Sequence, residues 1–394
     1  MTKTEKHVVL ISCLMLVIGL MAVDFFNPSL PYIMQSLQVS QNTTKTLIVA
    51  YMMTLGVTQF FYGRFSDLRG RKPAILTALC VAAVGLTLSS LADNITMLYL
   101  ARMITATGMA GCTVISRAVL VDVIKDKRTL RQAFSYFAMS SQISPAFAPV
   151  MGGFIQQYWG WRYAFALFVV LTLAALLLLL KIMPETHRHH HSDAGITGFS
   201  IYFRLLSDVR FTVYSLASAL LFVFTIGYYA STPFAFHQLG YSPVENSVFY
   251  LIYCAGILSG SWALSSVLLR LKAEILYRTL LAFISLICLI FLAVSEKSTS
   301  LVLWSLFSFG LSFSCGVMAP LTLALSMEAM VTFHGMASAL QGAIKMFFAG
   351  FFLALFDLVT IHCFISITWV FLLITLLLWG CVGIEIVWQK KLCH

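Results

Sequence analysis

The sequence predicts an all-α integral membrane protein whose twelve transmembrane helices form two bundles of six. Hydrophobic residues make up 60% of the 394 residues and charged residues only 10%, whereas a soluble domain carries about 25% charged residues. The apolar residues fall in continuous runs of roughly 20, the length of a helix that crosses a bilayer. Because the runs do not alternate as barrel strands do, each is expected to be a helix.

Twelve apolar runs follow one another along the chain. The long polar stretch at 185–210 is expected to be a cytoplasmic linker between an N-terminal six-helix bundle (1–184) and a C-terminal one (211–394). Segments 28–40 and 233–242 close the first and seventh spans in a similar way, which fits two parallel repeats. The expected spans cover residues 8–30, 45–65, 73–92, 96–120, 132–156, 161–183, 211–235, 244–268, 275–294, 299–325, 335–357 and 364–388.

The distribution of Lys and Arg predicts the orientation of the chain. If both termini are cytoplasmic, only Lys45, Arg162 and Lys297 lie on the outer side. Positive residues favour the cytoplasmic side, so the sequence predicts a multi-pass protein of the cell inner (plasma) membrane with both termini cytoplasmic. These loops account for the net charge of +10, and the expected partner is therefore the lipid bilayer rather than nucleic acid.

The loop between the second and third spans carries the most specific pattern of the chain, GRFSDLRGRKP at 63–73. Gly63 is expected to let two helices approach closely. Asp67 can accept hydrogen bonds from helix N-termini or from arginines. Gly70 permits a tight reversal, and Pro73 suits the first turn of the next helix.

This loop resembles the signature loop of the major facilitator superfamily. In span four, the segment that begins at Arg102 resembles the family's Arg-x-x-Gln-x-x-Gly motif, and 145–153 (PAFAPVMGG) resembles the antiporter motif of its twelve-span drug:proton antiporters. The segment 160–165 (GWRYAF) resembles the usual start of span six. Together these motifs, over roughly 20–165, are most similar to the bicyclomycin/chloramphenicol-resistance branch. The sequence departs from the usual residues at Leu68, Thr105, Val121 and Ser144.

The resemblance implies the superfamily fold and proton-coupled efflux of small, largely apolar or cationic molecules such as drugs, by alternating access. It implies a monomer whose partners are a small-molecule substrate and protons, with the proton gradient as energy source and no cofactor. A dedicated exporter of an endogenous metabolite, such as a siderophore, would share every motif. An uptake symporter is disfavoured by the span-five motif. No organised cluster of acid, His or Ser residues indicates an enzyme, and no phosphate-binding loop indicates ATP drive.

Asp24 is the clearest functional candidate that the residues themselves provide. A charge inside a span costs about 2.5–3.5 kcal/mol on insertion scales, so it normally faces a cavity and has a function. Asp24 is therefore expected to couple proton and substrate, although a helix cap or an interfacial acid would also fit. Arg102 is expected to pair with Asp24 or to orient a polar group of the substrate, unless it reaches the outer headgroups. The resemblance implies a role for Arg102 in the response to protons.

Further residues form a predicted gate and a predicted bend. Asp67, Arg71 and Asp122 are expected to hold the cytoplasmic side closed as paired charges that separate when the protein opens inward. The full predicted gate comprises Gly63, Asp67, Gly70, Arg71, Arg117 and Asp122. The antiporter motif residues Pro145, Pro149, Gly152 and Gly153 are expected to bend span five and to allow close packing.

Three other features leave alternatives open. The nine cysteines have no metal-site or redox spacing, so no metal site is expected from them. The histidines at 187–191 could bind a metal or belong to a solvated linker. Several aromatic residues could line an adaptable apolar pocket or simply pack: Tyr136, Phe224, Tyr228, Tyr229, Tyr250, Tyr253 and Trp262.

Overall fold

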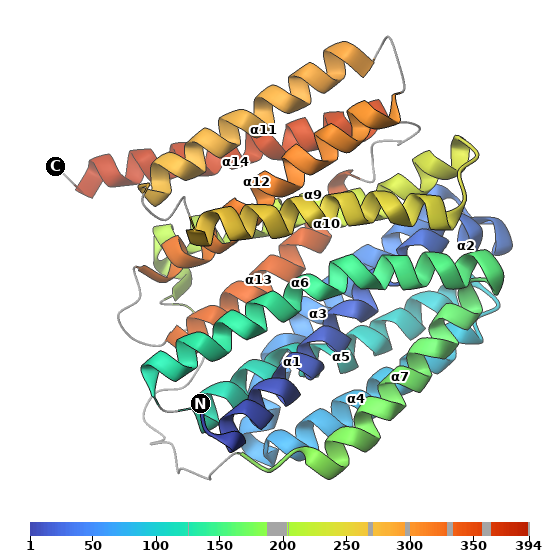
Figure 1. The fold of residues 1–394 in the computed structure, drawn as a ribbon, viewed down its shortest axis with the longest axis vertical. Coiled ribbons are helices and arrows are strands. Elements are labelled where there is room, and N and C mark those ends of the chain that lie inside the picture. The colour runs from blue at the N-terminus through green and yellow to red at the C-terminus, as the bar shows by residue number, and fades with distance from the viewer. Residues whose placement is uncertain are drawn as a thin grey trace. The chain divides into compact units, whose positions relative to one another are not determined.

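The computed structural model describes residues 1–124, 126–186, 203, 205–266, 271–295, 300–328, 334–356 and 364–392, and these residues are almost entirely helical (Figure 1). The histidine cluster at 187–191 lies outside them. Contacts divide the chain into two compact units. Unit 1 contains Met1–His190 with Gly240–Ser247, and unit 2 contains His191–Leu239 with Val248–His394.

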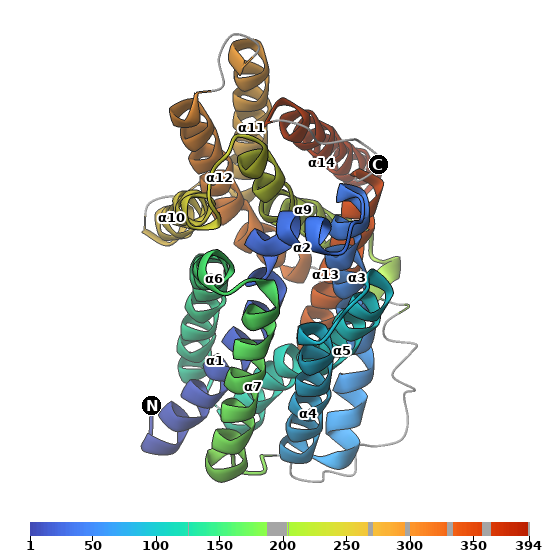
Figure 2. The same ribbon diagram turned by 90° about the vertical axis from the view of Figure 1, so that its right-hand side faces the viewer.

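The described residues of unit 1 form six long helices, of which the first is broken near its end. Its elements are α1 (Lys3–Asp24), η1 (Asn27–Ser29), α2 (Leu30–Ser36), α3 (Gln41–Arg69), α4 (Arg71–Ser90), α5 (Ile95–Val123), α6 (Lys127–Tyr158) and α7 (Trp161–Ile182). α4 packs against α5 and α7, and α1 packs against α5 and α6 (Figure 2).

The described residues of unit 2 form six more long helices, with α9 at the centre of their contacts. Its elements are α9 (Val209–Gln238), α10 (Pro243–Ser266, whose first residues, up to Ser247, belong to unit 1), α11 (Ala273–Ser295), α12 (Leu301–Glu328), α13 (His334–Phe356) and α14 (Phe364–Leu392). α9 packs against α12, α13 and α14, and α11 packs against α12 and α14.

These helices confirm the predicted all-α membrane fold. Ten helical segments of the described residues are long and apolar enough to cross a membrane, counting Lys3–Ser36 as one, and α13 adds the shorter apolar stretch Leu340–Leu355. Each expected span overlaps one long helix. Several helices continue past the expected limits, such as α3 to Arg69 and α5 to Val123, because hydropathy ends where polar side chains begin although the hydrogen-bonded helix goes on.

The first span is interrupted where two prolines occur close together. Pro28 lies in the first turn of η1 and Pro31 in the first turn of α2. Proline has no N–H to donate to the preceding turn and its ring clashes with that turn. The continuous helix therefore stops at Asp24, and the chain continues through a 3₁₀ turn into α2.

Small residues allow α4 and α5 to pack closely. A Cβ atom on Gly108 of α5 would lie 2.4 Å from the Ala78 oxygen and 2.4 Å from the Ala82 nitrogen of α4. On α4, a Cβ on Gly85 would lie 2.4 Å from the nitrogen of Thr105. Small residues one turn apart let backbones approach in lipid, where van der Waals packing drives helix association. This close contact holds α5, with its polar residues, in place.

The interior of unit 2 is aromatic. Tyr228 stacks on Tyr253 with ring centroids 4.4 Å apart, and Trp304 stacks on Phe364 at 4.3 Å. Tyr229 and Tyr250 join the same cluster. Two of the aromatic residues noted in the sequence do not belong to it: Tyr136 of unit 1 is 44% exposed and Trp262 is 68% exposed.

Candidate functional site

Unit 1 contains two groups of polar side chains that the sequence analysis singled out in part. The first, here called the Asp24 site, consists of Asp24, Asn27, Tyr51 and Arg102, and it surrounds the end of α1. The second, here called the α3–α4 network, consists of Ser66, Asp67, Arg71, Asp122 and Glu185. Each is built from helices distant in sequence, which the packing of unit 1 brings together.

Asp24 is the last residue of α1, and its side chain lies inside the protein. Only 6% of the residue is exposed. The side-chain amide of Asn27, in the 3₁₀ turn that follows, hydrogen-bonds its carboxylate. The helix break therefore places a carboxyl group and its amide partner within the core of unit 1, and Asp24 is not an interfacial acid on the surface of this unit.

Arg102 is fully buried, and its guanidinium contacts two aromatic rings and one backbone carbonyl. Its guanidinium carbon lies 4.1 Å from the ring centroid of Phe26 and 4.1 Å from that of Tyr51. Its two Nη groups both donate to the Ala22 carbonyl oxygen at 3.2 Å. The last carbonyls of a helix lack intrahelical donors, so Arg102 satisfies a group that the end of α1 leaves without one.

The expected direct pairing of Arg102 with Asp24 is not present. No ion pair joins the two side chains, both of which the structure describes, although they are close enough to interact electrostatically. Both Nη groups of the guanidinium instead donate to the Ala22 oxygen. Arg102 therefore acts on Asp24 as a nearby fixed charge.

The antiporter motif residues lie on α6, close to the end of α1. A Cβ atom on Gly152 would come within 1.6 Å of the Phe25 oxygen, so α6 can pass this point only with glycine there. A Cβ on Gly153 would come within 2.0 Å of the hydroxyl of Ser247, a residue of the same unit. Pro149 is buried, whereas the side chain of Pro145 lies outside the described part of the chain. The motif thus packs beside the Asp24 site.

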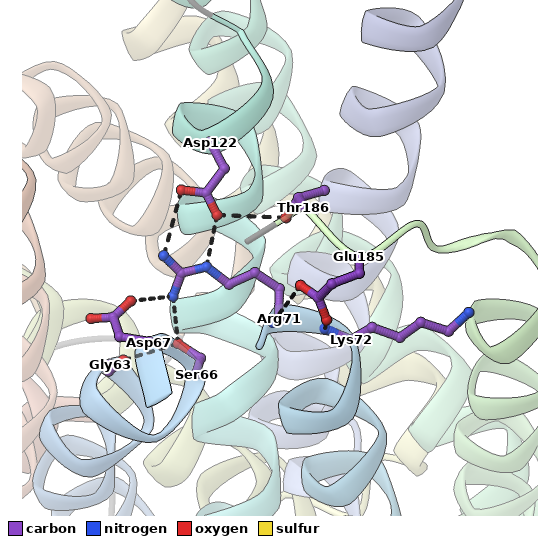
Figure 3. A network of polar contacts seen from close by, with 8 residues as sticks. All are labelled: Gly63, Ser66, Asp67, Arg71, Lys72, Asp122, Glu185 and Thr186. Atoms are coloured by element: carbon purple, nitrogen blue, oxygen red, sulfur yellow. Dashed lines mark hydrogen bonds and ion pairs between the residues drawn. The ribbon is translucent and has the colours of Figure 1, made fainter. Parts of the chain in front are cut away.

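The α3–α4 network is centred on Arg71 (Figure 3). Its Nε donates to Asp122 at 2.7 Å, and its Nη1 donates to Asp67 at 2.5 Å and to the Ser66 hydroxyl at 2.7 Å. The Arg71 side chain is 9% exposed, whereas that of Asp67 is 58% exposed. Asp67, Arg71 and Asp122, predicted as a group, thus lie together and join α3, α4 and α5.

Glu185 completes this network, and the sequence analysis did not identify it. Its two carboxylate oxygens accept from the backbone nitrogens of Arg71 at 2.9 Å and Lys72 at 3.1 Å. A carboxylate at a helix N-terminus satisfies free N–H groups and complements the helix dipole. Gly70, just before α4, has φ +95°, and a Cβ there would lie 2.7 Å from Glu185. The predicted tight reversal at Gly70 is therefore present.

Two predicted gate residues differ from expectation. Arg117 does not join the network as the structure describes it, and its guanidinium carbon lies 6.0 Å from the ring centroid of Phe137 on α6. Gly63 does not mediate a close helix contact, because a Cβ on it would meet no described atom within 4 Å. Glycine at this position therefore has no packing reason within the described residues.

Unit 2 has its own buried acid, which was also missed. Glu385 of α14 is 3% exposed and accepts a hydrogen bond of 2.6 Å from the hydroxyl of Tyr214 on α9. Near the start of α9, Arg210 donates to Glu274 of α11 at 3.2 Å. The signal for Glu385 was available, because an acid within an apolar run is unusual.

Known proteins resemble the chain along most of its length. It is 25% identical over 364 residues to Multidrug resistance protein D of Escherichia coli (strain K12), covering 87% of each chain. It is 28% identical over 166 residues to the Bicyclomycin resistance protein homolog of Haemophilus influenzae (strain ATCC 51907 / DSM 11121 / KW20 / Rd), covering 42% of each. Its fold is similar to that of a D-xylose-proton symporter, with a TM-score of 0.77, 14% identity, and coverage of 95% and 97%.

The family follows from these matches together with the helices. The sequence profile of the Major Facilitator Superfamily matches residues 12–354, which is most of the chain. The motifs quoted from the sequence lie within that range. The protein is therefore a membrane transporter, not an enzyme, and it belongs to the Major Facilitator Superfamily.

Proposed function

We propose that this transporter exports small, largely apolar or cationic molecules in exchange for protons, by alternating access. The observation that carries the proposal is Asp24, a carboxyl group buried at a broken helix end beside a fixed cation. Relatives described as multidrug and bicyclomycin resistance proteins support export of drug-like substrates. The antiporter motif beside the site supports the same direction of transport.

The proposed coupling is electrostatic. Desolvation favours the neutral form of a carboxyl group, whereas a nearby cation favours its charged form. Asp24 is subject to both effects, because it is buried and Arg102 lies nearby. A cationic substrate that arrives near Asp24 adds to the second effect and expels the proton. Proton and substrate therefore compete for one carboxyl group, which is the requirement for antiport.

One proton per cycle supplies enough energy for useful export. Moving one elementary charge through 100 mV provides about 2.3 kcal/mol. Since a tenfold ratio costs about 1.4 kcal/mol, this sustains a gradient of about 40-fold for a neutral substrate. A pH difference across the membrane adds to that figure.

The proposal also covers how the two bundles are placed in the membrane and how the cytoplasmic side is gated. The N-terminal bundle (1–184) and the C-terminal bundle (211–394) would alternate around a central site in the inner membrane, with both termini cytoplasmic. The α3–α4 network would then lie on the cytoplasmic side. There Asp67, Arg71, Asp122 and Glu185 would stabilise one state of the cycle, through the charged contacts described above.

Proton release from purified protein tests the coupling directly. A pH indicator in weak buffer is used to record proton release when a panel of cationic drugs is added to the wild type and to Asp24→Asn. We expect release from the wild type and none from the variant. Asp93→Asn is the matched control, because the Asp93 side chain is 89% exposed and lies outside the site. Equal release from the wild type and Asp24→Asn would contradict the assignment.

The substrate class needs a second experiment. Cells that lack the protein should become more sensitive to the drugs that trigger proton release. If no drug sensitivity changes and one endogenous metabolite, such as a siderophore, instead disappears from the medium, the protein is a dedicated metabolite exporter. Either result is compatible with proton antiport, but only increased drug sensitivity supports a drug as the substrate.

A further inference from the structure

The Asp24 site contains four buried polar atoms that have no hydrogen-bond partner among the described residues. They are Oδ1 of Asp24, Oδ1 of Asn27, the hydroxyl oxygen of Tyr51 and Nε of Arg102. Tyr51 and Arg102 are fully buried, Asn27 is 1% exposed and Asp24 is 6% exposed. Leaving a buried polar group without a hydrogen bond is unfavourable, so four such atoms at one place would be a large penalty.

The four residues belong to one site rather than to separate defects. Asn27 hydrogen-bonds Asp24, and the Arg102 guanidinium stacks on the Tyr51 ring at 4.1 Å. Asp24 and Tyr51 are close enough to interact electrostatically with each other and with Arg102. Their contacts with one another use other atoms, so the four atoms named above remain available for a ligand.

The chemistry of these atoms identifies the ligand class. Oδ1 of Asp24 and Oδ1 of Asn27 are acceptors, whereas the Arg102 Nε–H and the Tyr51 hydroxyl are donors. A water molecule donates two hydrogen bonds and accepts two, which matches this set. Buried waters typically make about three hydrogen bonds to polar groups that otherwise have no partner.

We propose that the Asp24 site binds at least one structural water molecule, held by the Asp24 and Asn27 oxygens, the Tyr51 hydroxyl and Arg102 Nε. This water makes Tyr51 a positioning residue for the carboxyl group, since the hydroxyl acts on Asp24 through the water. It also gives Asp24 a hydrogen-bonded neighbour to which a proton can pass. The water's presence is independent of the proposed antiport, whereas its use in proton transfer rests on that proposal.

Infrared difference spectroscopy on reconstituted, substrate-free protein tests the inference. Spectra are recorded between two pH values in ordinary water and in water labelled with oxygen-18. The ionisable groups around the site are Asp24 of α1, Tyr51 of α3, and Arg102 and Cys112 of α5. We expect an O–H stretching band that shifts with the oxygen isotope, because bound water responds when the charge beside it changes.

Tyr51→Phe is the informative variant. It removes one donor but keeps the ring on which Arg102 stacks. The isotope-sensitive band should shift or disappear in this variant, with little change in thermal unfolding. Tyr62→Phe is the control, since Tyr62 is another buried tyrosine of α3 and lies outside the site. It should leave the band unchanged.

The outcomes separate this inference from the proposed function. Absence of an isotope-sensitive band in the wild type, or an identical band in wild type and Tyr51→Phe, would overturn the bound water. A band that appears only after a drug is added would assign the site to a polar group of the substrate, and would also overturn it. Loss of proton release in Asp24→Asn can persist in either case, so the antiport proposal stands or falls separately.

Discussion

A single guanidinium connects three helices of unit 1. Arg102 of α5 donates to the Ala22 oxygen at the end of α1 and contacts the rings of Phe26 and of Tyr51 on α3. The planar group donates two hydrogen bonds to one oxygen and also makes cation–π contacts with two rings, a combination that an ammonium group cannot reproduce.

Arg102→Lys should therefore destabilise the protein by about 3 kcal/mol and impair transport. The substitution keeps the charge but loses stacking, worth about 0.5–2 kcal/mol, and leaves the Ala22 oxygen poorly satisfied, at about 1–3 kcal/mol. Unfolding in detergent measures the loss of stability, and drug-induced proton release measures the impairment of transport. Arg162→Lys is the control, because the Arg162 side chain is 41% exposed, and we expect it to cost less than about 1 kcal/mol. Equal losses in the two variants would contradict this account of Arg102.

Gly63, which lies within α3, and Gly70, which directly follows it, should respond differently to alanine. Gly70→Ala should cost about 1–3 kcal/mol, because φ +95° with an extended ψ is a conformation that essentially only glycine adopts. Gly63→Ala should be neutral or stabilising by up to about 1 kcal/mol, since it lies in a helix with free space beside it. Thermal unfolding of both variants checks this.

The transport activity of Gly63→Ala tests whether Gly63 belongs to the proposed gate. If the variant is stable but transports poorly, Gly63 is needed in a state of the cycle other than the one described, as the gate proposal requires. If it is stable and fully active, Gly63 should be removed from the gate.

At the scale of elements, the contact between α4 and α5 depends on the absence of side chains. Gly108→Ala would place a methyl group 2.4 Å from two backbone atoms of α4, and backbone cannot move aside as a flexible side chain can. Overpacking typically costs about 1–3 kcal/mol, and we expect the upper part of that range. Gly383→Ala on α14, where a Cβ meets no described atom within 4 Å, is the control. A stable Gly108→Ala would show that the helices can separate at little cost.

The sequence predicted the positions of the helices along the chain better than it predicted the contacts between residues of different helices. Apolar runs predicted the long helices of the described residues because hydrophobic length is a local property, and the in-span charge rule found Asp24 and Arg102. The same rule would have found Glu385, had it been applied to the last span. The contact of Arg102 with Ala22, and that of Glu185 with the start of α4, depend on where helices end and cross. Those are tertiary properties that spacing along the chain does not contain.

At the scale of the whole molecule, the orientation in the membrane is open to a direct test. α4 separates Leu68 from Asp93, which are both exposed, so the two lie at opposite ends of one span. A membrane-impermeant thiol reagent should label Asp93→Cys in intact cells above the level of the unmodified chain. It should label Leu68→Cys only after the cells are permeabilised. The reverse pattern would contradict cytoplasmic termini.

The contacts that hold Arg102 in place have a consequence for the net charge of the Asp24 and Arg102 pair. Because Phe26, Tyr51 and the Ala22 oxygen hold the guanidinium in place, its positive charge stays where it is whatever happens at Asp24. The pair is neutral overall while the carboxyl group is ionised, and it carries a full positive charge once a hydrogen ion has bound. A cation approaching this region would be tolerated in the first condition and repelled in the second.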